Sequence, residues 1–124
     1  MPELHAVGVF CGSSPGHDPR NLVLAREVGA ALALRGLGLV YGGGQVGLMG
    51  AVADACLDGG GSVVGVIPKA LFAHEVVHPG VQELVEVATM HERKALMYDR
   101  SDAFLALPGG LGTLAELCEV ATWA

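Results

Sequence analysis

Hydrophobic and polar positions alternate between two patterns along the chain. Short runs of apolar and β-branched residues are separated by longer stretches in which apolar residues recur every three or four positions. The first pattern predicts strands and the second predicts helices. The expected strands are 4–10, 37–41, 62–67, 83–87 and 103–107, and the expected helices are 19–35, 48–57, 89–99 and 113–123.

This alternation of strands and helices predicts βαβ units, and therefore an α/β fold with a doubly wound parallel sheet and helices on both faces. The apolar run at 62–67 is typical of a strand that is covered on both faces. Residues 68–81 break the pattern and predict a loop with one helical turn. The sequence has no internal repeat and no linker, so we expect a single domain over residues 1–124.

Several helix ends carry local signals. Asp18 and Pro19 predict a cap followed by proline at the first helical position, and Gly36 predicts the end of that helix. Thr89 with Glu92 three residues later forms a second expected start, a capping box.

Four turns each follow a strand and lead into a helix, at 11–16, 42–47, 90–94 and 108–113. In a parallel sheet these turns meet at the carboxyl ends of the strands, where such sheets bind ligands. Glycine-rich turns before helices present backbone N–H groups and a partial positive charge. We therefore expect an anionic, nucleotide-sized ligand, with Ser13, Gly43 and Gly44 among its contacts.

Composition narrows the classes of function. The 124 residues are 52% hydrophobic and 16% charged, with a net charge of −6, which excludes a disordered chain and argues against a nucleic-acid partner. No apolar run reaches membrane-spanning length, so we expect no membrane partner. Three cysteines without a C-x-x-C pair are typical of a reduced, cytoplasmic protein. We expect Cys11 to be a small buried hydrophobic residue.

The glycines at 42, 44 and 47 match the dinucleotide fingerprint in form, but the acid expected after the next strand is replaced by Pro68 and Lys69. A dinucleotide site, a helix-packing turn and a nucleotide pocket of another kind all fit. Residues 74–78 match the zinc motif H-E-x-x-H in form. Because Pro79 and Gly80 follow at once, a solid helix is not expected there, and neither is a metal.

The stretch from Pro108 to Glu116 carries the most information. Thr113 and Glu116 form a capping box, which alone does not explain the three glycines before it. A phosphate at the start of this helix would need such bare backbone, and Glu116 would lie one turn in, tilted back toward it. Arg93 and Lys94 have two interpretations, a solvated charged face or an anion-binding wall opposite Glu116.

Five motifs then occur together and in order: Cys11-Gly12-Ser13-Ser14, Tyr41-Gly42-Gly43-Gly44-x-x-Gly47-Leu48-Met49-Gly50, Val66-Ile67-Pro68, Met90-His91-Glu92-Arg93-Lys94 and Pro108-Gly109-Gly110-x-Gly112-Thr113-x-x-Glu116. This set resembles the Lonely guy (LOG) family of cytokinin-activating phosphoribohydrolases, once misnamed lysine decarboxylases. The resemblance spans essentially the whole chain and implies a Rossmann-like fold. The older name would require a pyridoxal phosphate site, for which the residues give no basis, so we expect no cofactor.

The family hydrolyses the N-glycosidic bond of N6-modified adenosine 5′-monophosphate to free base and ribose 5-phosphate. The resemblance implies that Arg93 and Glu116 are the catalytic pair and that Glu75 contacts the substrate. It also implies that the nucleotide is held by Lys94 and by the segment Gly109, Gly110, Leu111, Gly112, Thr113 and Glu116. A carboxylate suits this chemistry because it stabilises or captures an oxocarbenium-like transition state. Capture by Glu116 and activation of water both remain open.

The resemblance further implies a homodimer. Family members continue beyond the last helix with another strand and further helices, so we expect this chain to be a fragment or a shortened member, with an unpaired edge on the strand 103–107. The alternative function is a non-catalytic carrier of a nucleotide or of the molybdenum cofactor, because such carriers share a similar fold and glycine-rich pocket.

Overall fold

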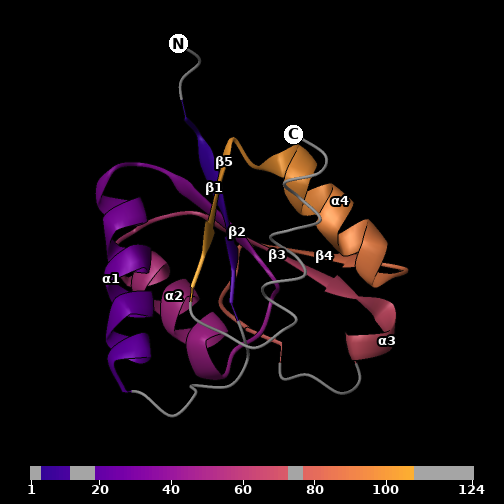
Figure 1. The fold of residues 1–124 in the computed structure, drawn as a ribbon, viewed down its shortest axis with the longest axis horizontal. Coiled ribbons are helices and arrows are strands. Elements are labelled where there is room, and N and C mark those ends of the chain that lie inside the picture. Colours follow the sequence, from indigo (N-terminus) through magenta and orange to yellow (C-terminus); the bar gives the residue numbers. More distant parts are fainter. Residues whose placement is uncertain (1–3, 12–18, 73–76, 108–124) are drawn as a thin grey trace.

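The computed structural model describes residues 4–11, 19–72 and 77–107. These residues form a five-stranded sheet with helices packed on it (Figure 1). The strands are β1 (Ala6–Phe10), β2 (Gly38–Tyr41), β3 (Val63–Pro68), β4 (Glu83–Val87) and β5 (Ala103–Ala106). The helices are α1 (Arg20–Leu34), α2 (Gly47–Asp58), α3 (Lys69–Phe72) and α4 (Met90–Arg100).

All neighbouring strands are parallel, in the order β4-β3-β2-β1-β5. Helices α1 and α2 cover one face of the sheet, and α4 lies on the other (Figure 1). The predicted α/β fold with a doubly wound parallel sheet is therefore confirmed. The chain extends the sheet in one direction from β1 to β4 and then returns to place β5 on the other side of β1, which makes the ends of β1 and β5 the switch point of the sheet.

Side chains alternate along each strand between the two faces, as the two-residue period of a strand requires. Val9, Leu39 and Val63 belong to the core on the α1 and α2 side. Phe10, Val40 and Val66 belong to the core on the α4 side, which Met97 of α4 completes. The sheet is thus buried on both faces, and β3 is covered as its apolar run predicted.

Helix α1 ends as the sequence predicted. Gly36 has a positive φ of 69°, and the backbone N–H groups of Gly36 and Leu37 donate to the carbonyl oxygens of Ala33 and Leu32. This is the Schellman arrangement, which satisfies carbonyl groups that would otherwise have no partner at a helix end. Helix α2 ends in the same way at Gly60, whose φ is 81°.

Helices α1 and α2 approach each other very closely at Gly29. A Cβ atom at this position would overlap the carbonyl oxygen of Val52, and Ala55 and Cys56 would lie about as close as contact allows. Only a residue without a side chain lets the two helix backbones meet here. The contact fixes the spacing of the helical layer on that face.

For the elements within the described residues, predicted and observed boundaries differ by at most two residues. One capping prediction was wrong by one position, because Pro19 occupies the N-cap of α1 and the helix begins at Arg20. The single helical turn expected within 68–81 is α3. Asp18 and the helix expected at 113–123 lie outside the described residues. Among the helices that the structure describes, none is long and apolar enough to cross a membrane.

Candidate functional site

The first turn of α4 carries the motif that contains Arg93 and Lys94. Thr89 is the N-cap, and its Oγ1 accepts a hydrogen bond from the backbone N–H of Glu92 at 3.1 Å. The return bond of the expected capping box is shifted by one residue, since Glu92 Oε2 accepts from the N–H of Ala88 at 2.8 Å. The predicted helix start is confirmed, and only the partner of Glu92 was wrong.

Arg93 is buried, with a relative exposure of 4%. Its Nε donates to the carbonyl oxygen of Val66 in β3 at 2.8 Å, and its Nη2 donates to the carbonyl oxygen of Gly42 just after β2. A further Nη1 contact reaches the sulfur of Met90 at 3.6 Å. The guanidinium therefore joins α4 to the carboxyl ends of two neighbouring strands.

The charge and planar shape of the guanidinium explain this position. Backbone carbonyls at strand ends need donors when they are buried, and hydrogen bonds from a charged donor are stronger than those from a neutral one. Arginine delivers several N–H groups in one rigid plane, so the two carbonyls also fix its orientation. The solvated-face interpretation is wrong for Arg93.

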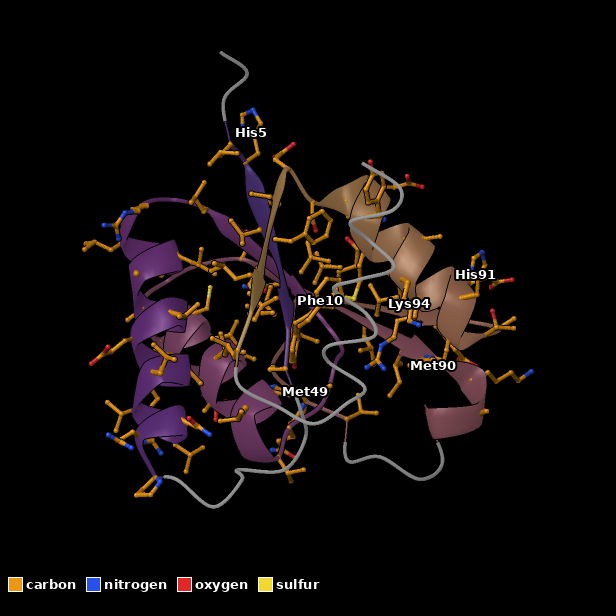
Figure 2. The ribbon with its side chains drawn as sticks, in the orientation of Figure 1. His5, Phe10, Met49, Met90, His91 and Lys94 are labelled. Atoms are coloured by element: carbon orange, nitrogen blue, oxygen red, sulfur yellow. The ribbon has the colours of Figure 1, made fainter. Side chains whose placement is uncertain are left out.

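The remaining residues of this turn divide between two sides of α4. Met90, Arg93, Lys94 and Met97 share one stripe of the helix, because residues three and four apart lie on the same face. Figure 2 shows Met90 and Lys94 on the side of α4 toward the sheet and His91 on the outer side. Lys94 is half-buried and His91 is exposed. Lys94 thus lies beside Arg93 at the same end of α4.

The glycine turn, Gly42, Gly43 and Gly44, lies directly against Arg93. Each of its three carbonyl oxygens accepts a hydrogen bond from a different part of the chain: Gly42 from Arg93, Gly43 from the backbone N–H of His78 at 3.0 Å, and Gly44 from the hydroxyl of Tyr41 at 2.9 Å. A Cβ atom at Gly42 would overlap the Arg93 guanidinium. The carbonyl side of the turn is thus fully engaged by the protein.

Tyr41 supplies a donor that stays protonated. Burial raises the pKa of its hydroxyl far above its usual value, and the charge of Asp54 raises this pKa further. The hydroxyl group therefore keeps its proton, which it donates to the carbonyl oxygen of Gly44.

His78 lies on the other side of the turn. Its Nδ1 accepts from the N–H of Gly80 at 2.9 Å, so the ring proton is on Nε2, which donates to Asp54 Oδ1 at 2.5 Å. Both ring nitrogens are engaged, which leaves His78 unsuited to the H-E-x-x-H zinc site considered from the sequence. His74 lies outside the described residues, and the part of the chain that is described contains no cluster of His, Cys, Asp or Glu that could hold a metal.

The structure brings part of the predicted site together. Gly43, Gly44, Arg93 and Lys94 lie at the carboxyl edge of the sheet, as the pattern of turns predicted. The N–H of Leu107 donates to the carbonyl oxygen of Phe10 at 2.8 Å, so the ends of β1 and β5 meet at the same edge. The other predicted site residues lie outside the described residues: Ser13, Glu75, Gly109, Gly110, Leu111, Gly112, Thr113 and Glu116. Their roles stay predictions.

Three residues beside the turn were missed as parts of the site. Tyr41 offered a signal, because a tyrosine at the end of a buried strand needs a partner for its hydroxyl. His78 was considered only as a zinc ligand. Asp54 lies 24 positions from His78 in the sequence and gave no signal at all.

A separate groove of about 730 Å³ lies between α1 and α2. It is lined by Leu22, Arg26, Ala30, Leu34, Gln45, Gly47, Gly50, Ala51, Asp54, Ala55, Asp58 and Gly59. None of the predicted site residues that the structure describes lines it. Asp54, which pairs with His78 beside the glycine turn, also lines this groove, so the groove adjoins the turn on its α2 side.

A family model described as "Possible lysine decarboxylase" matches residues 49–124. The cytokinin riboside 5′-monophosphate phosphoribohydrolase of Rhodococcoides fascians is 52% identical over 124 residues, covering 99% of this chain and 63% of its own length. The enzyme of that name called LOG4 from Arabidopsis thaliana is 55% identical over 116 residues, covering 94% of this chain and 54% of its own. The chain belongs to the LOG family.

Membership of the LOG family confirms the resemblance read from the five motifs. The Arabidopsis thaliana relative called LOG1 gives the same picture, with 53% identity over 116 residues, 94% of this chain and 54% of its own length. The chain therefore spans between about half and two thirds of the length of these curated relatives.

Solved structures show how widely the fold is shared. A molybdenum cofactor binding protein from the phototrophic bacterium Rippkaea orientalis has a TM-score of 0.83 at 25% identity, over 98% of this chain and 73% of that one. The molybdenum cofactor carrier protein of Chlamydomonas reinhardtii has a TM-score of 0.83 at 23% identity, over 97% of this chain and 72% of that one. This likeness supports the Rossmann-like fold, whereas the sequence identity to the LOG enzymes is more than twice as high.

Proposed function

We propose that this protein hydrolyses the N-glycosidic bond of N6-modified adenosine 5′-monophosphate. Water adds to the anomeric carbon, and the base leaves with a proton, so that the products are free base and ribose 5-phosphate. The observation that carries the proposal is the position of Arg93, which is buried at the carboxyl edge of the sheet and oriented by two strand-end carbonyls. The chain around it is more than half identical to cytokinin riboside 5′-monophosphate phosphoribohydrolases.

Each residue of the proposed site has a distinct task. The backbone N–H groups of the segment 109–113 bind the 5′-phosphate, at the place where the sequence predicts the start of a helix. Glu116 stabilises the positive charge that develops on the ribose as the bond breaks. Arg93 is fixed before the substrate arrives and orients it without a further loss of side-chain freedom. Lys94 adds positive charge for the phosphate from the same end of α4.

Incubation of the protein with N6-isopentenyl adenosine 5′-monophosphate tests the proposal, with free base and ribose 5-phosphate quantified by chromatography. We expect release by the natural protein and loss of release in Glu116→Gln and Arg93→Ala. Arg100→Ala is the matched control, because Arg100 lies on the same helix but is exposed and pairs with Glu83 at 3.1 Å. Circular dichroism establishes that each variant is folded.

The same experiment separates the enzyme from a carrier. A carrier of a nucleotide or of the molybdenum cofactor would bind its ligand without releasing base, and Glu116→Gln would bind as well as the natural protein. Absence of base release from the natural protein, or full release by folded Glu116→Gln, would overturn the proposal. The two molybdenum cofactor proteins described above are 25% and 23% identical to this chain, so the hydrolase is the better supported of the two.

A further inference from the structure

We propose that His78 is a positioning residue for Arg93, because it holds the glycine turn whose first carbonyl fixes the guanidinium. The inference deepens the proposed function and rests on it for its kinetic consequences. Its structural part, the coupling of His78 to the orientation of Arg93, stands on the described contacts alone.

The first step is the bond from the His78 backbone to the turn. Its N–H donates to the carbonyl oxygen of Gly43 at 3.0 Å, and the neighbouring Val77 forms an antiparallel bridge with Gly44. Gly43 has a positive φ of 83°. Glycine loses more conformational freedom on folding than other residues, so three in a row need partners from outside the turn to keep one shape.

The second step is the anchor on the His78 side chain. The ring is 6% exposed, and its Nε2 donates to Asp54 of α2 while its Nδ1 accepts from Gly80. Helix α2 begins at Gly47, directly beyond the turn. His78 therefore holds the turn by its backbone and the helix that follows the turn by its ring.

The third step leads from the turn to Arg93. Of the two carbonyls that orient the guanidinium, that of Val66 belongs to β3 in the interior of the sheet, between β2 and β4. The carbonyl of Gly42 belongs to the glycine turn and depends on how the turn is held. Loss of the His78 anchor would let the Gly42 carbonyl move, so that this carbonyl no longer holds the guanidinium in the orientation that it sets together with Val66. A misplacement of about 1 Å in a positioning group can lower a rate by about 100-fold.

Kinetics of base release test this coupling. For His78→Ala we expect kcat to fall by about 10- to 100-fold with KM changed by less than about threefold, because orientation is lost while the phosphate contacts remain. His78→Gln restores much of kcat, since its amide N–H can donate to Asp54 in place of Nε2. Leu32→Ala is the control, because it removes a buried side chain of α1 outside the turn. We expect it to lower the melting temperature and to retain kcat. All variants are assayed well below their melting temperatures.

A second readout needs no activity. The Arg93 Nε–H signal of 15N-labelled protein is assigned by its absence in Arg93→Lys. We expect this proton to exchange slowly with solvent in the natural protein and in Leu32→Ala. In His78→Ala it should exchange at least about tenfold faster, because its hydrogen bond is no longer held in place. A His78→Ala variant with the kcat and the Arg93 exchange rate of Leu32→Ala would overturn the inference. If the natural protein releases no base, the proposed function fails, and the exchange rates still decide whether His78 positions Arg93.

Discussion

The side chain of Arg93 and the carbonyl group of Gly42 are joined by a hydrogen bond across 51 positions of the sequence. Because Gly42 directly follows β2, this bond places the first turn of α4 at the end of a strand to which α4 is not adjacent in the chain. Arg93 completes the hydrogen bonds of buried backbone, and in the proposed function it has a second task, presenting a positive charge to the substrate.

Arg93→Lys separates these two tasks. Lysine keeps the charge, but its single ammonium group does not match both carbonyls in one plane. We expect a loss of about 1–3 kcal/mol in the free energy of unfolding, measured in urea, from the carbonyl that is left without a donor. Arg100→Lys should change it by less than about 0.5 kcal/mol, because the exposed pair with Glu83 contributes little. Equal effects of the two substitutions would contradict this role of Arg93.

Thr89→Ala tests the start of α4. It removes the oxygen that accepts from the N–H of Glu92, so the free energy of unfolding should fall by about 1 kcal/mol. Thr89→Ser keeps a hydroxyl in the same place and should stay close to the natural protein. Urea titrations followed by circular dichroism distinguish the two, and a serine variant as unstable as the alanine variant would argue against the cap.

Gly36→Ala tests the backbone conformation at the end of α1. Space is not limiting, since no other group lies within contact distance of a Cβ there, but the φ of 69° is strained for any residue with a side chain. We expect a loss of about 1–2 kcal/mol in the free energy of unfolding. Gly36→Asn should lose less, because asparagine tolerates this region better. The two variants are compared by urea titration, and a Gly36→Ala variant as stable as the natural protein would refute the argument.

Gly29→Ala tests sterics without conformational strain. Alanine is favoured over glycine inside a helix by about 1 kcal/mol. The overlap with the carbonyl oxygen of Val52 opposes this gain, and overpacking of a tight interior contact costs about 1–3 kcal/mol. We expect the clash to exceed the helix preference, so thermal unfolding should occur at a lower temperature in Gly29→Ala. A higher melting temperature would show that α1 and α2 can move apart freely.

The carboxyl group of Asp102 makes part of the free energy of unfolding depend on pH. Its Oδ2 accepts from the N–H groups of His5 at 2.8 Å and Ala6 at 3.1 Å, and these bonds lower the pKa of the carboxyl group. A lowered pKa in the folded state gives stability that is present above the unfolded pKa, near 3.9, and is lost as pH falls through the folded value. The advantage of the natural protein over Asp102→Asn should therefore shrink below about pH 4. A difference in unfolding free energy that stays constant from pH 7 to pH 3 would contradict this.

Most of the fold followed from local sequence signals. Gly36 and Thr89 mark helix ends by chemistry that acts within a few residues, and the structure confirms both. The apolar run of β3 was sufficient to predict a strand buried on both faces. Pro19 was misplaced by one position because proline lacks an N–H and has a fixed φ, so it fits the N-cap and the first helical position with similar ease.

The sequence predicted which residues belong to the candidate site better than it predicted the contacts between them. Arg93 was identified by its motif, yet nothing near it in the sequence indicates that Val66 and Gly42 accept its hydrogen bonds. The spacing of His74 and His78 suggested a helical metal motif for consideration, whereas His78 directly follows the isolated β-bridge of Val77 with Gly44, beside the glycine turn. Such partners are decided by the register of the sheet and the packing of loops, which local periodicity does not contain.

The close approach of α1 and α2 at Gly29 has a mechanical consequence. Because the two backbones meet at Gly29, a sliding or tilting motion of one helix displaces the other. The first turn of α2 belongs to this pair of helices, and the chain just before it forms the glycine turn that faces Arg93. The close packing of α1 on α2 therefore limits how far the glycine turn can move at the carboxyl edge of the sheet.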